Sequence, residues 1–278
     1  MGNQAERAKR FEALHEGPEL LLIPNPWDPG SAKLLASLGF RALATTSGGS
    51  AATLGRLDGS MAREEAIASA AAIVEATDLP VSADLENGFA DDATGVAETM
   101  RLALDAGLAG ASVEDYTRSE EKLYDIGVAG ERVAAAAEAA HNGPSRLVLT
   151  ARAENHLYGI TDLDDTIARL QAYQEAGADV LYAPGLSRLE DIEQIVSSVD
   201  RPVNVLGRPG APSVAELAAI GVRRVSVGGA FAYAALGAAV EAARELLDKG
   251  TYGYFERAGV GLQAARSAFA EAPDEPAA

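Results

Sequence analysis

Residues 175–181 read EAGADVL: the last turn of an expected helix, then a glycine, then a short apolar run. The same order recurs at 37–43 (SLGFRAL), 105–111 (DAGLAGA) and 219–225 (AIGVRRV). A glycine just past a helix supplies the left-handed residue that ends it, and here a strand can start within a few residues. One joint repeated along the chain predicts one repeating helix-to-strand architecture rather than two domains.

Working outward from these joints, the chain shows eight short apolar runs separated by helical periodicity. The expected strands are Leu20–Pro24, Arg41–Thr46, Pro80–Leu85, Gly110–Glu114, Arg146–Ala151, Asp179–Ala183, Pro202–Leu206 and Arg223–Val227. Eight such units within 278 residues predict an α/β fold, a (β/α)₈ TIM barrel, as a single domain over 1–278. We expect a short N-terminal helix, a C-terminal helical tail and a frayed end at Glu271–Ala278.

The composition excludes several classes of partner. The chain has 41 acidic and 23 basic residues, a net charge of -18, which disfavours nucleic acid and anionic membranes. A small anionic substrate would need a local cation. Cysteine is absent, so thiolate catalysis and cysteine-ligated zinc are excluded. Without a signal peptide or an apolar run of membrane-spanning length, the expected location is the cytoplasm.

Acidic residues follow the third and fourth expected strands, where a barrel carries its chemistry. Asp84 and Glu86 are two residues apart, so on a strand they would point the same way, and Glu114 ends the neighbouring run. Converging carboxylates need a cation, and oxygen ligands favour Mg²⁺ or Mn²⁺. The sequence thus predicts a metal site of Asp84, Glu86 and Glu114. The alternative is that these acids cap helices or pair with Arg152.

Other strand ends carry candidate substrate-binding groups. The guanidinium fork of Arg152 suits a substrate carboxylate, although a structural pair with Glu154 or Glu114 is an equal alternative. The small turn Ser47, Gly48 and Gly49 could direct backbone N–H groups at an anion, and Asn204 lies on the seventh run. Gly228-Gly229 opens the last helix, where barrels either hold phosphate or simply pack closely.

Several motifs, in order, resemble the isocitrate lyase and phosphoenolpyruvate mutase superfamily. They are TTSGGSAATLGRLDG (45–59), SADLENGF (82–89), SVED (112–115) and TARAEN (150–155), and the resemblance extends from about Asn25 to about Leu247. The stretch NVLGRPGAPSVAELAAIGVRRVSVGGA (204–230) is similar to the phosphonomutase-like branch, described as carboxyphosphonoenolpyruvate phosphonomutase-like.

The resemblance implies a barrel enzyme that binds Mg²⁺ and a small 2-oxo acid or its enolate. It implies that Asp84 is the direct metal ligand and that Asp58, Glu86 and Glu114 hold the metal's waters. Ser47, Gly48 and Gly49 would hold the substrate carboxylate, and Arg152 the substrate's anionic end. The same resemblance implies a homo-oligomer, a dimer or tetramer, in which the last helix is exchanged between subunits.

The loop 116–125 departs from the pattern. It lacks the cysteine of the lyases and the Lys-Thr-Asn type of loop of the mutases, and Pro184-Gly185 stands where the mutases carry a histidine. The leading expectation is therefore a Mg²⁺-dependent carbon–carbon lyase, either an oxaloacetate decarboxylase-like enzyme or a retro-aldol enzyme, with Arg152, Glu114 and Asp58 in catalytic roles. The alternatives are a phosphonate-related P–C mutase or hydrolase, and a barrel that binds a metal or metabolite without turnover.

Overall fold

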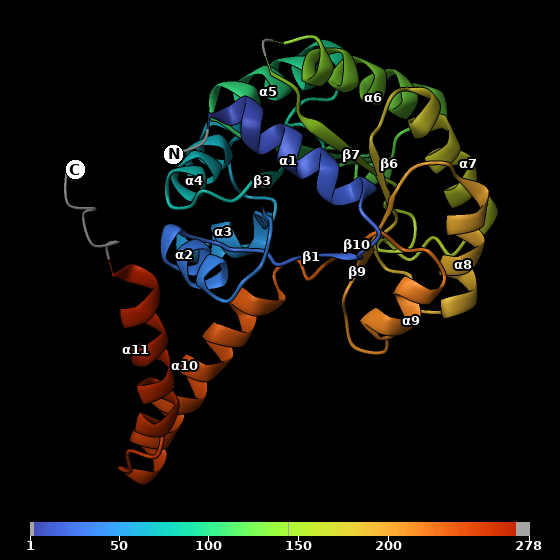
Figure 1. Ribbon diagram of the computed structural model, residues 1–278. Coiled ribbons are helices and arrows are strands. Elements are labelled where there is room, and N and C mark those ends of the chain that lie inside the picture. The colour runs from blue at the N-terminus through green and yellow to red at the C-terminus, as the bar shows by residue number, and fades with distance from the viewer. Residues whose placement is uncertain (1–2, 144, 271–278) are drawn as a thin grey trace.

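The computed structural model describes residues 3–143 and 145–270, and it shows parallel strands inside a ring of helices (Figure 1). The expected frayed end at 271–278 lies outside the described residues. The barrel strands are β1 (Leu21–Ile23), β2 (Leu43–Ala44), β3 (Val81–Asp84), β4 (Gly110–Glu114), β7 (Val148–Arg152), β8 (Val180–Tyr182), β9 (Val203–Leu206) and β10 (Arg224–Ser226). Each falls in one of the eight predicted runs, except that β7 continues one residue further, to Arg152. The (β/α)₈ prediction is confirmed.

The strands pair in parallel in the order β1-β10-β9-β8-β7-β4-β3-β2, which leaves one seam between β1 and β2. Two contacts join that seam. The Ala44 N–H donates to the Pro24 carbonyl at 3.0 Å, and the Asn25 side-chain amide donates to the Thr45 carbonyl at 3.0 Å. The barrel is therefore nearly closed.

Helices surround the barrel and cover its N-terminal end, and the last two of them project from it. They are α1 (Gln4–Glu16), α2 (Pro29–Ser37), α3 (Ser47–Thr53), α4 (Arg63–Glu75), α5 (Ala93–Asp105), α6 (Ile126–His141), α7 (Leu163–Glu175), α8 (Leu189–Ser198), α9 (Val214–Ala219), α10 (Ala230–Lys249) and α11 (Phe255–Phe269). The four repeated joints behave as expected, because Gly39, Gly107, Gly177 and Gly221 all have φ between 78° and 103°. Only glycine adopts this region without cost.

Two hydrophobic clusters hold the fold together. The larger lies between the strands and the outer helices. The smaller fills the N-terminal end of the barrel, where Phe11 and Leu14 of α1 pack on Leu21, Val148 and Val180 at the starts of their strands. Gly110 makes this contact possible, because a Cβ there would lie 2.6 Å from the Phe11 ring. Helix α1 therefore closes one end of the barrel, and the other end is left for the site.

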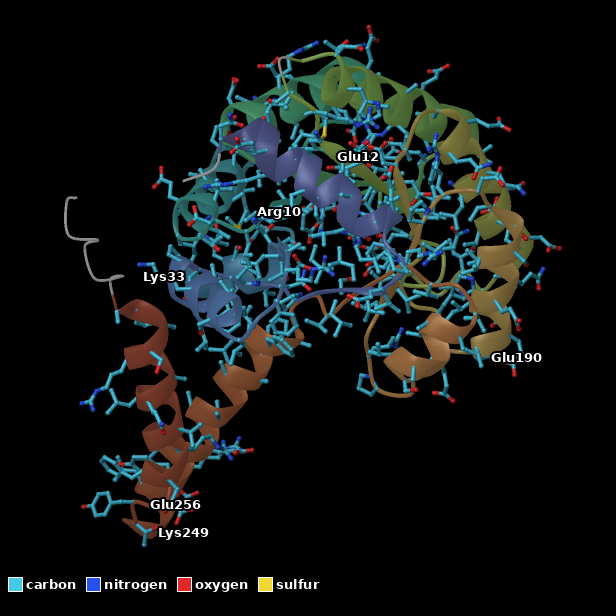
Figure 2. The ribbon with its side chains drawn as sticks, viewed as in Figure 1. Arg10, Glu12, Lys33, Glu190, Lys249 and Glu256 are labelled. Carbon is cyan, nitrogen blue, oxygen red and sulfur yellow. The ribbon has the colours of Figure 1, made fainter. Side chains whose placement is uncertain are left out.

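The C-terminal helices α10 and α11 form a hairpin that projects from the barrel (Figure 1). Charged side chains, among them Lys249 and Glu256 near the hairpin tip, extend from the molecule into solvent (Figure 2). Helix α11 returns to contact α2. Within the described ranges, none of the helices is both long enough and apolar enough to cross a bilayer. The cytoplasmic location stays a prediction.

Candidate active site

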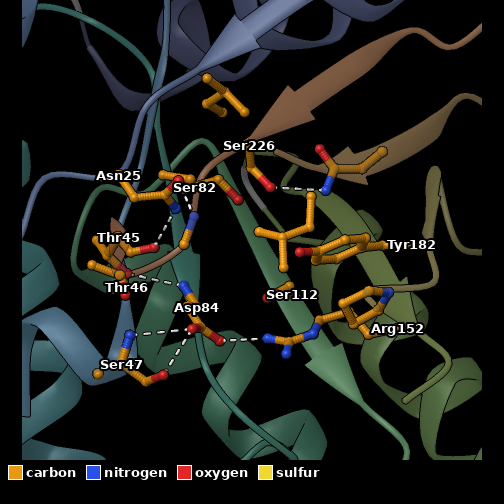
Figure 3. Close-up of a pocket in the computed structure, with 18 of the residues that line it drawn as sticks. Asn25, Thr45, Thr46, Ser47, Ser82, Asp84, Ser112, Arg152, Tyr182 and Ser226 are labelled. Atoms are coloured by element: carbon orange, nitrogen blue, oxygen red, sulfur yellow. Dashed lines mark hydrogen bonds and ion pairs between the residues drawn. The ribbon is translucent and has the colours of Figure 1, made fainter. Parts of the chain in front are cut away.

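A cavity of about 290 Å³ opens at the carboxyl ends of the strands and descends into the barrel (Figure 3). Its upper part is lined by Asp84 and Arg152, and its lower part by Asn204 and Arg224. Binding pockets for drug-sized ligands start near 300 Å³, so this cavity suits a small organic molecule.

Asp84 ends β3 and is the most firmly held acid of the cavity. Its Oδ2 accepts from the Ser47 N–H at 3.1 Å and from the Ser47 hydroxyl at 2.9 Å, and its Oδ1 lies 2.8 Å from Nη1 of Arg152 (Figure 3). Burial alone would raise its pKa, but Arg152 and the Ser47 hydrogen bonds outweigh that effect, so the pKa of Asp84 lies below its ordinary value. The carboxylate is therefore ionised at neutral pH.

Glu86 is oriented differently from the sequence prediction. Strand β3 stops at Asp84, and Glu86 has a left-handed backbone with φ of 49°, so the alternation of a strand does not apply to it. A non-glycine residue in that region is strained, and such residues cluster at functional sites. The Glu86 carboxylate lies 2.8 Å from Nε of Arg118. Burial raises its pKa to about 7, against the opposing effect of Arg118.

Arg152, at the end of β7, is the centre of the charge cluster. Its guanidinium contacts Asp84 at 2.8 Å, Glu114 at 3.0 Å and Glu154 at 2.8 Å. Burial raises the pKa of Glu114, and of Glu154, above the ordinary value, because Arg152 offsets only part of the desolvation. All three contacts are among the structural pairs that the sequence left open for Arg152.

The acids fit a hydrated Mg²⁺ better than a metal caged by protein ligands. In residues 3–143 and 145–270, no group of three acids or histidines is arranged to ligate a metal directly. Mg²⁺ keeps several waters, however, and binds through one or two carboxylates. Oε1 of Glu114 is buried without a hydrogen-bond partner. Asp84 would hold the ion, and Glu86 and Glu114 would accept hydrogen bonds from its waters.

The other residues expected at the site fall into two groups. Asp58, Ser47 and Gly48 line the cavity, and a Cβ at Gly48 would lie 3.3 Å from Cγ of Asp58. Gly49 lies behind it, where its N–H donates to the Thr46 hydroxyl at 3.3 Å and where a Cβ would clash with Thr46. The expected turn is the first turn of helix α3, and the Ser47 N–H is already engaged by Asp84.

Asn204 lies deeper than the acids. Its side chain donates to the Ser226 hydroxyl at 3.0 Å and accepts from Arg224 at 2.8 Å. At Gly228, the N–H donates to Oδ1 of Asn25 at 2.9 Å, as does that of Val227. Because these two N–H groups already donate to Asn25, close packing explains Gly228-Gly229 better than a phosphate site does.

The segment 116–125 includes a short hairpin of β5 (Tyr116–Thr117) and β6 (Lys122–Leu123). Tyr116 stacks on Tyr158 with ring centroids 3.5 Å apart, which ties the hairpin to the segment that follows β7. Arg118 reaches Glu86 and Glu114, whereas Lys122 pairs with Glu120 at the surface.

Among the cavity residues that were not identified from the sequence, three stand out: Tyr182, Tyr233 and Arg224. Cζ of Arg152 lies over the ring of Tyr182, 5.5 Å from its centroid. The Tyr233 hydroxyl borders Gly48, where a Cβ would lie 3.0 Å from it. Arg224 lies in the barrel interior. The only available signal was position, since Tyr182 and Arg224 occupy inward-facing positions of predicted strands.

The fold and the site together define a (β/α)₈ enzyme with a cluster of carboxylates and arginines at the carboxyl ends of its strands. The family model for phosphoenolpyruvate phosphomutase matches residues 11–247. The chain therefore belongs to this family, within the phosphoenolpyruvate mutase and isocitrate lyase superfamily.

Several similar proteins are named as lyases or as enzymes of oxaloacetate. A solved structure from Burkholderia cenocepacia J2315, provisionally described as a lyase or mutase, is 50% identical with a TM-score of 0.93 and covers 96% of this chain and 98% of its own. Oxaloacetate decarboxylase 2 of Pseudomonas fluorescens (strain Pf0-1) is 30% identical, over 85% of this chain and 83% of its own. Oxaloacetate acetylhydrolase in complex with oxalate is 25% identical with a TM-score of 0.82, covering 97% and 100%.

Proposed function

We propose that this protein is a Mg²⁺-dependent lyase that cleaves a carbon–carbon bond of a small 2-oxo acid through an enolate. The observation that carries the proposal is the Asp84–Arg152 pair, whose side chains are only 19% and 12% exposed, held by Ser47 and surrounded by further acids in a small cavity. The names of the similar decarboxylase and acetylhydrolase support a carbon–carbon bond as the target.

The chain's residues would divide the work as follows. A bound Mg²⁺ supplies Lewis-acid stabilisation of negative charge on the substrate's 2-oxo oxygen. Asp84 holds that cation, while Arg152 keeps the acids in place and presents a fixed positive charge to the developing enolate. Glu114 and Asp58 accept hydrogen bonds from water around the cation, and Ser47 and Gly48 border the substrate carboxylate. Mn²⁺ suits the same oxygen ligands.

One assay separates this function from its alternatives. Oxaloacetate, malate-type hydroxy acids and phosphonopyruvate are incubated with the protein and Mg²⁺, and product is followed by nuclear magnetic resonance. Carbon–carbon cleavage supports the proposal. Release of phosphate or P–C rearrangement would assign mutase or hydrolase chemistry, and binding without turnover would leave a metabolite-binding barrel.

The metal assignment has a direct binding test. Asp84→Ala should abolish Mg²⁺ binding in calorimetry, with the circular dichroism spectrum retained. Asp105→Ala is the matched control, because that acid lies exposed at the end of α5. Unchanged Mg²⁺ affinity in Asp84→Ala would overturn the assignment.

We also propose a homo-oligomer, a dimer or tetramer, whose subunits exchange the C-terminal hairpin. Large apolar side chains of α10 and α11 are exposed in the single chain, including Val240, Leu247 and Val260. Packing against a second copy would remove them from water. Light scattering across a dilution series tests the proposal, and a monomer at micromolar concentration would contradict it.

A further inference from the structure

The floor of the cavity contains an arginine with an unusual set of partners. Arg224 begins β10 and is 5% exposed. Its guanidinium donates to Oδ1 of Asn204 at 2.8 Å and to the Thr150 hydroxyl at 3.0 Å, and it lies 3.3 Å from Nε2 of His15. All three partners are neutral groups, since burial and Arg224 itself lower the pKa of His15 to about 3.

No carboxylate forms an ion pair with Arg224 in the part of the chain that the structure describes. A buried charge without a counter-charge costs several kcal/mol, so proteins normally pair it. Burial lowers the pKa of Arg224 to about 10, which still leaves it charged at neutral pH. The guanidinium has five N–H donors, and the three contacts engage each nitrogen once. It therefore keeps both charge and donor capacity for an anion.

The position of Arg224 is suited to a ligand that also reaches the acids. It lines the same cavity as Asp84 and Arg152. Its partner Thr150 precedes Arg152 by two residues on β7, a separation of about 7 Å at the usual strand rise. The two ends of the cavity are therefore separated by about two strand residues, a depth that suits a short dicarboxylate. Below Arg224, the apolar cluster around Phe11 and helix α1 closes the barrel.

We propose that the cavity floor binds the second carboxylate of a dicarboxylic substrate, with the Arg224 guanidinium as its charge partner and Asn204 positioning that guanidinium. The inference rests on the proposed function for the upper end of the cavity, where the 2-oxo acid group would bind. It assigns the substrate to the 2-oxo dicarboxylates or their hydroxy adducts, in preference to monocarboxylates.

The test compares two ligands that differ only at the distal end. Malate and lactate share a 2-hydroxy acid group, and malate carries a carboxylate where lactate carries hydrogen on its methyl. Dissociation constants for both, with Mg²⁺ present, are measured by calorimetry on the full-length protein. The variants are Arg224→Gln, Arg224→Lys and the control Arg223→Gln, whose arginine is exposed and contacts Gly17 and Pro18 outside the barrel.

We expect the wild type to prefer malate over lactate by at least tenfold. Arg224→Gln should reduce that preference to threefold or less, Arg224→Lys should retain part of it, and Arg223→Gln should keep it. If Arg224→Gln fails to fold, Asn204→Asp replaces it. A carboxylate beside Arg224 would neutralise the guanidinium and reduce the preference for malate in the same way. A wild type without the preference, or a preference unchanged in both Arg224→Gln and Asn204→Asp, would overturn the inference.

A separate measurement isolates the proposed function. Oxalate spans only the upper end of the cavity, so its affinity should depend on Mg²⁺ and on Asp84. If oxalate affinity depends on neither, the proposed function fails. The ratio of malate to lactate affinity still tests whether Arg224 binds a carboxylate at the cavity floor.

Discussion

Two arginines line the same cavity of the barrel in opposite electrostatic surroundings. Arg152, at the carboxyl ends of the strands, contacts the carboxylates of Asp84, Glu114 and Glu154. Arg224, near the floor, contacts neutral groups: among the residues that the structure describes, its partners are Asn204, Thr150 and His15. Accordingly, neighbouring acids raise the pKa of Arg152, despite its burial, while burial lowers that of Arg224.

The difference shows that a buried arginine is not by itself an anion-binding site. Three acids already share the charge of Arg152, so a substrate carboxylate arriving there depends on an added cation as well as on Arg152. Arg224 has no carboxylate partner among residues 3–143 and 145–270, so its charge is available to attract an anion directly. The mouth of the cavity is thus arranged for a metal and the floor for an anion, which together suit a substrate with two negatively charged ends.

The largest expected effect comes from breaking the compensated cluster. Arg152→Ala leaves three buried carboxylates without their cation, so we expect the free energy of unfolding to fall by about 3–5 kcal/mol. Oxalate affinity should weaken by roughly 2–5 kcal/mol, as for loss of a buried charge partner. Urea denaturation and calorimetry measure the two. Equal oxalate affinity in the variant and the wild type would make Arg152 purely structural.

The pH dependence of stability tests the neutral surroundings of Arg224. Folding lowers the pKa of His15 from 6.5 to about 3, so this group stabilises the fold above pH 6.5 and loses that contribution as pH falls toward 3. At pH 5 the loss is about 2 kcal/mol, at 1.36 kcal/mol per pKa unit. Urea denaturation at pH 7 and pH 5 should show a larger decrease for wild type than for His15→Gln. Parallel decreases would contradict a buried neutral His15.

A smaller effect is expected from supplying the missing counter-charge. Asn204→Asp places a carboxylate near Nε of Arg224, 2.8 Å from the present acceptor, so the free energy of unfolding should rise by about 1 kcal/mol. The Ser226 hydroxyl can reverse its hydrogen bond to donate to the new group. Thermal denaturation checks the direction. A destabilised variant would mean that Arg224 is sufficiently compensated by its neutral partners.

The smallest effect on stability is expected at the rim of the mouth. The Arg118 side chain is 34% exposed, so Arg118→Ala should change the free energy of unfolding by less than about 1 kcal/mol. The substitution removes the Arg118 guanidinium, which competes with Mg²⁺ for Glu86 and Glu114. Calorimetry should therefore show Mg²⁺ binding several-fold more tightly. Lys122→Ala, which removes a cation paired with Glu120, is the control. Weaker Mg²⁺ binding in Arg118→Ala would show that Arg118 supports the metal site.

The fold could be predicted because its signals are local. Four helix-to-strand joints share the same glycine, and the strands are short runs rich in apolar residues, so both patterns are visible within a few residues. Asp84, Glu114 and Arg152 were found for the same reason, since they end strands whose carboxyl ends must meet.

The rest of the site depends on backbone geometry and on distant partners. The left-handed conformation of Glu86 is fixed partly by its carbonyl, which accepts from the Glu114 N–H at 2.8 Å. Strand alternation cannot anticipate that turn. Arg224 stands out because its partners among the described residues are neutral groups. A sequence pattern does not show which groups surround a side chain in the folded barrel.

The contact between His15 and Arg224 joins residues 209 positions apart. Helix α1 precedes every strand of the barrel along the chain, yet the strand that completes its binding surface is the last of the barrel. During synthesis the apolar face of α1 therefore stays exposed, or bound to a chaperone, until β10 has been made. The closing of the barrel's base is therefore expected to be a late event of folding, and a chain shortened at its N-terminus would admit water beneath Arg224.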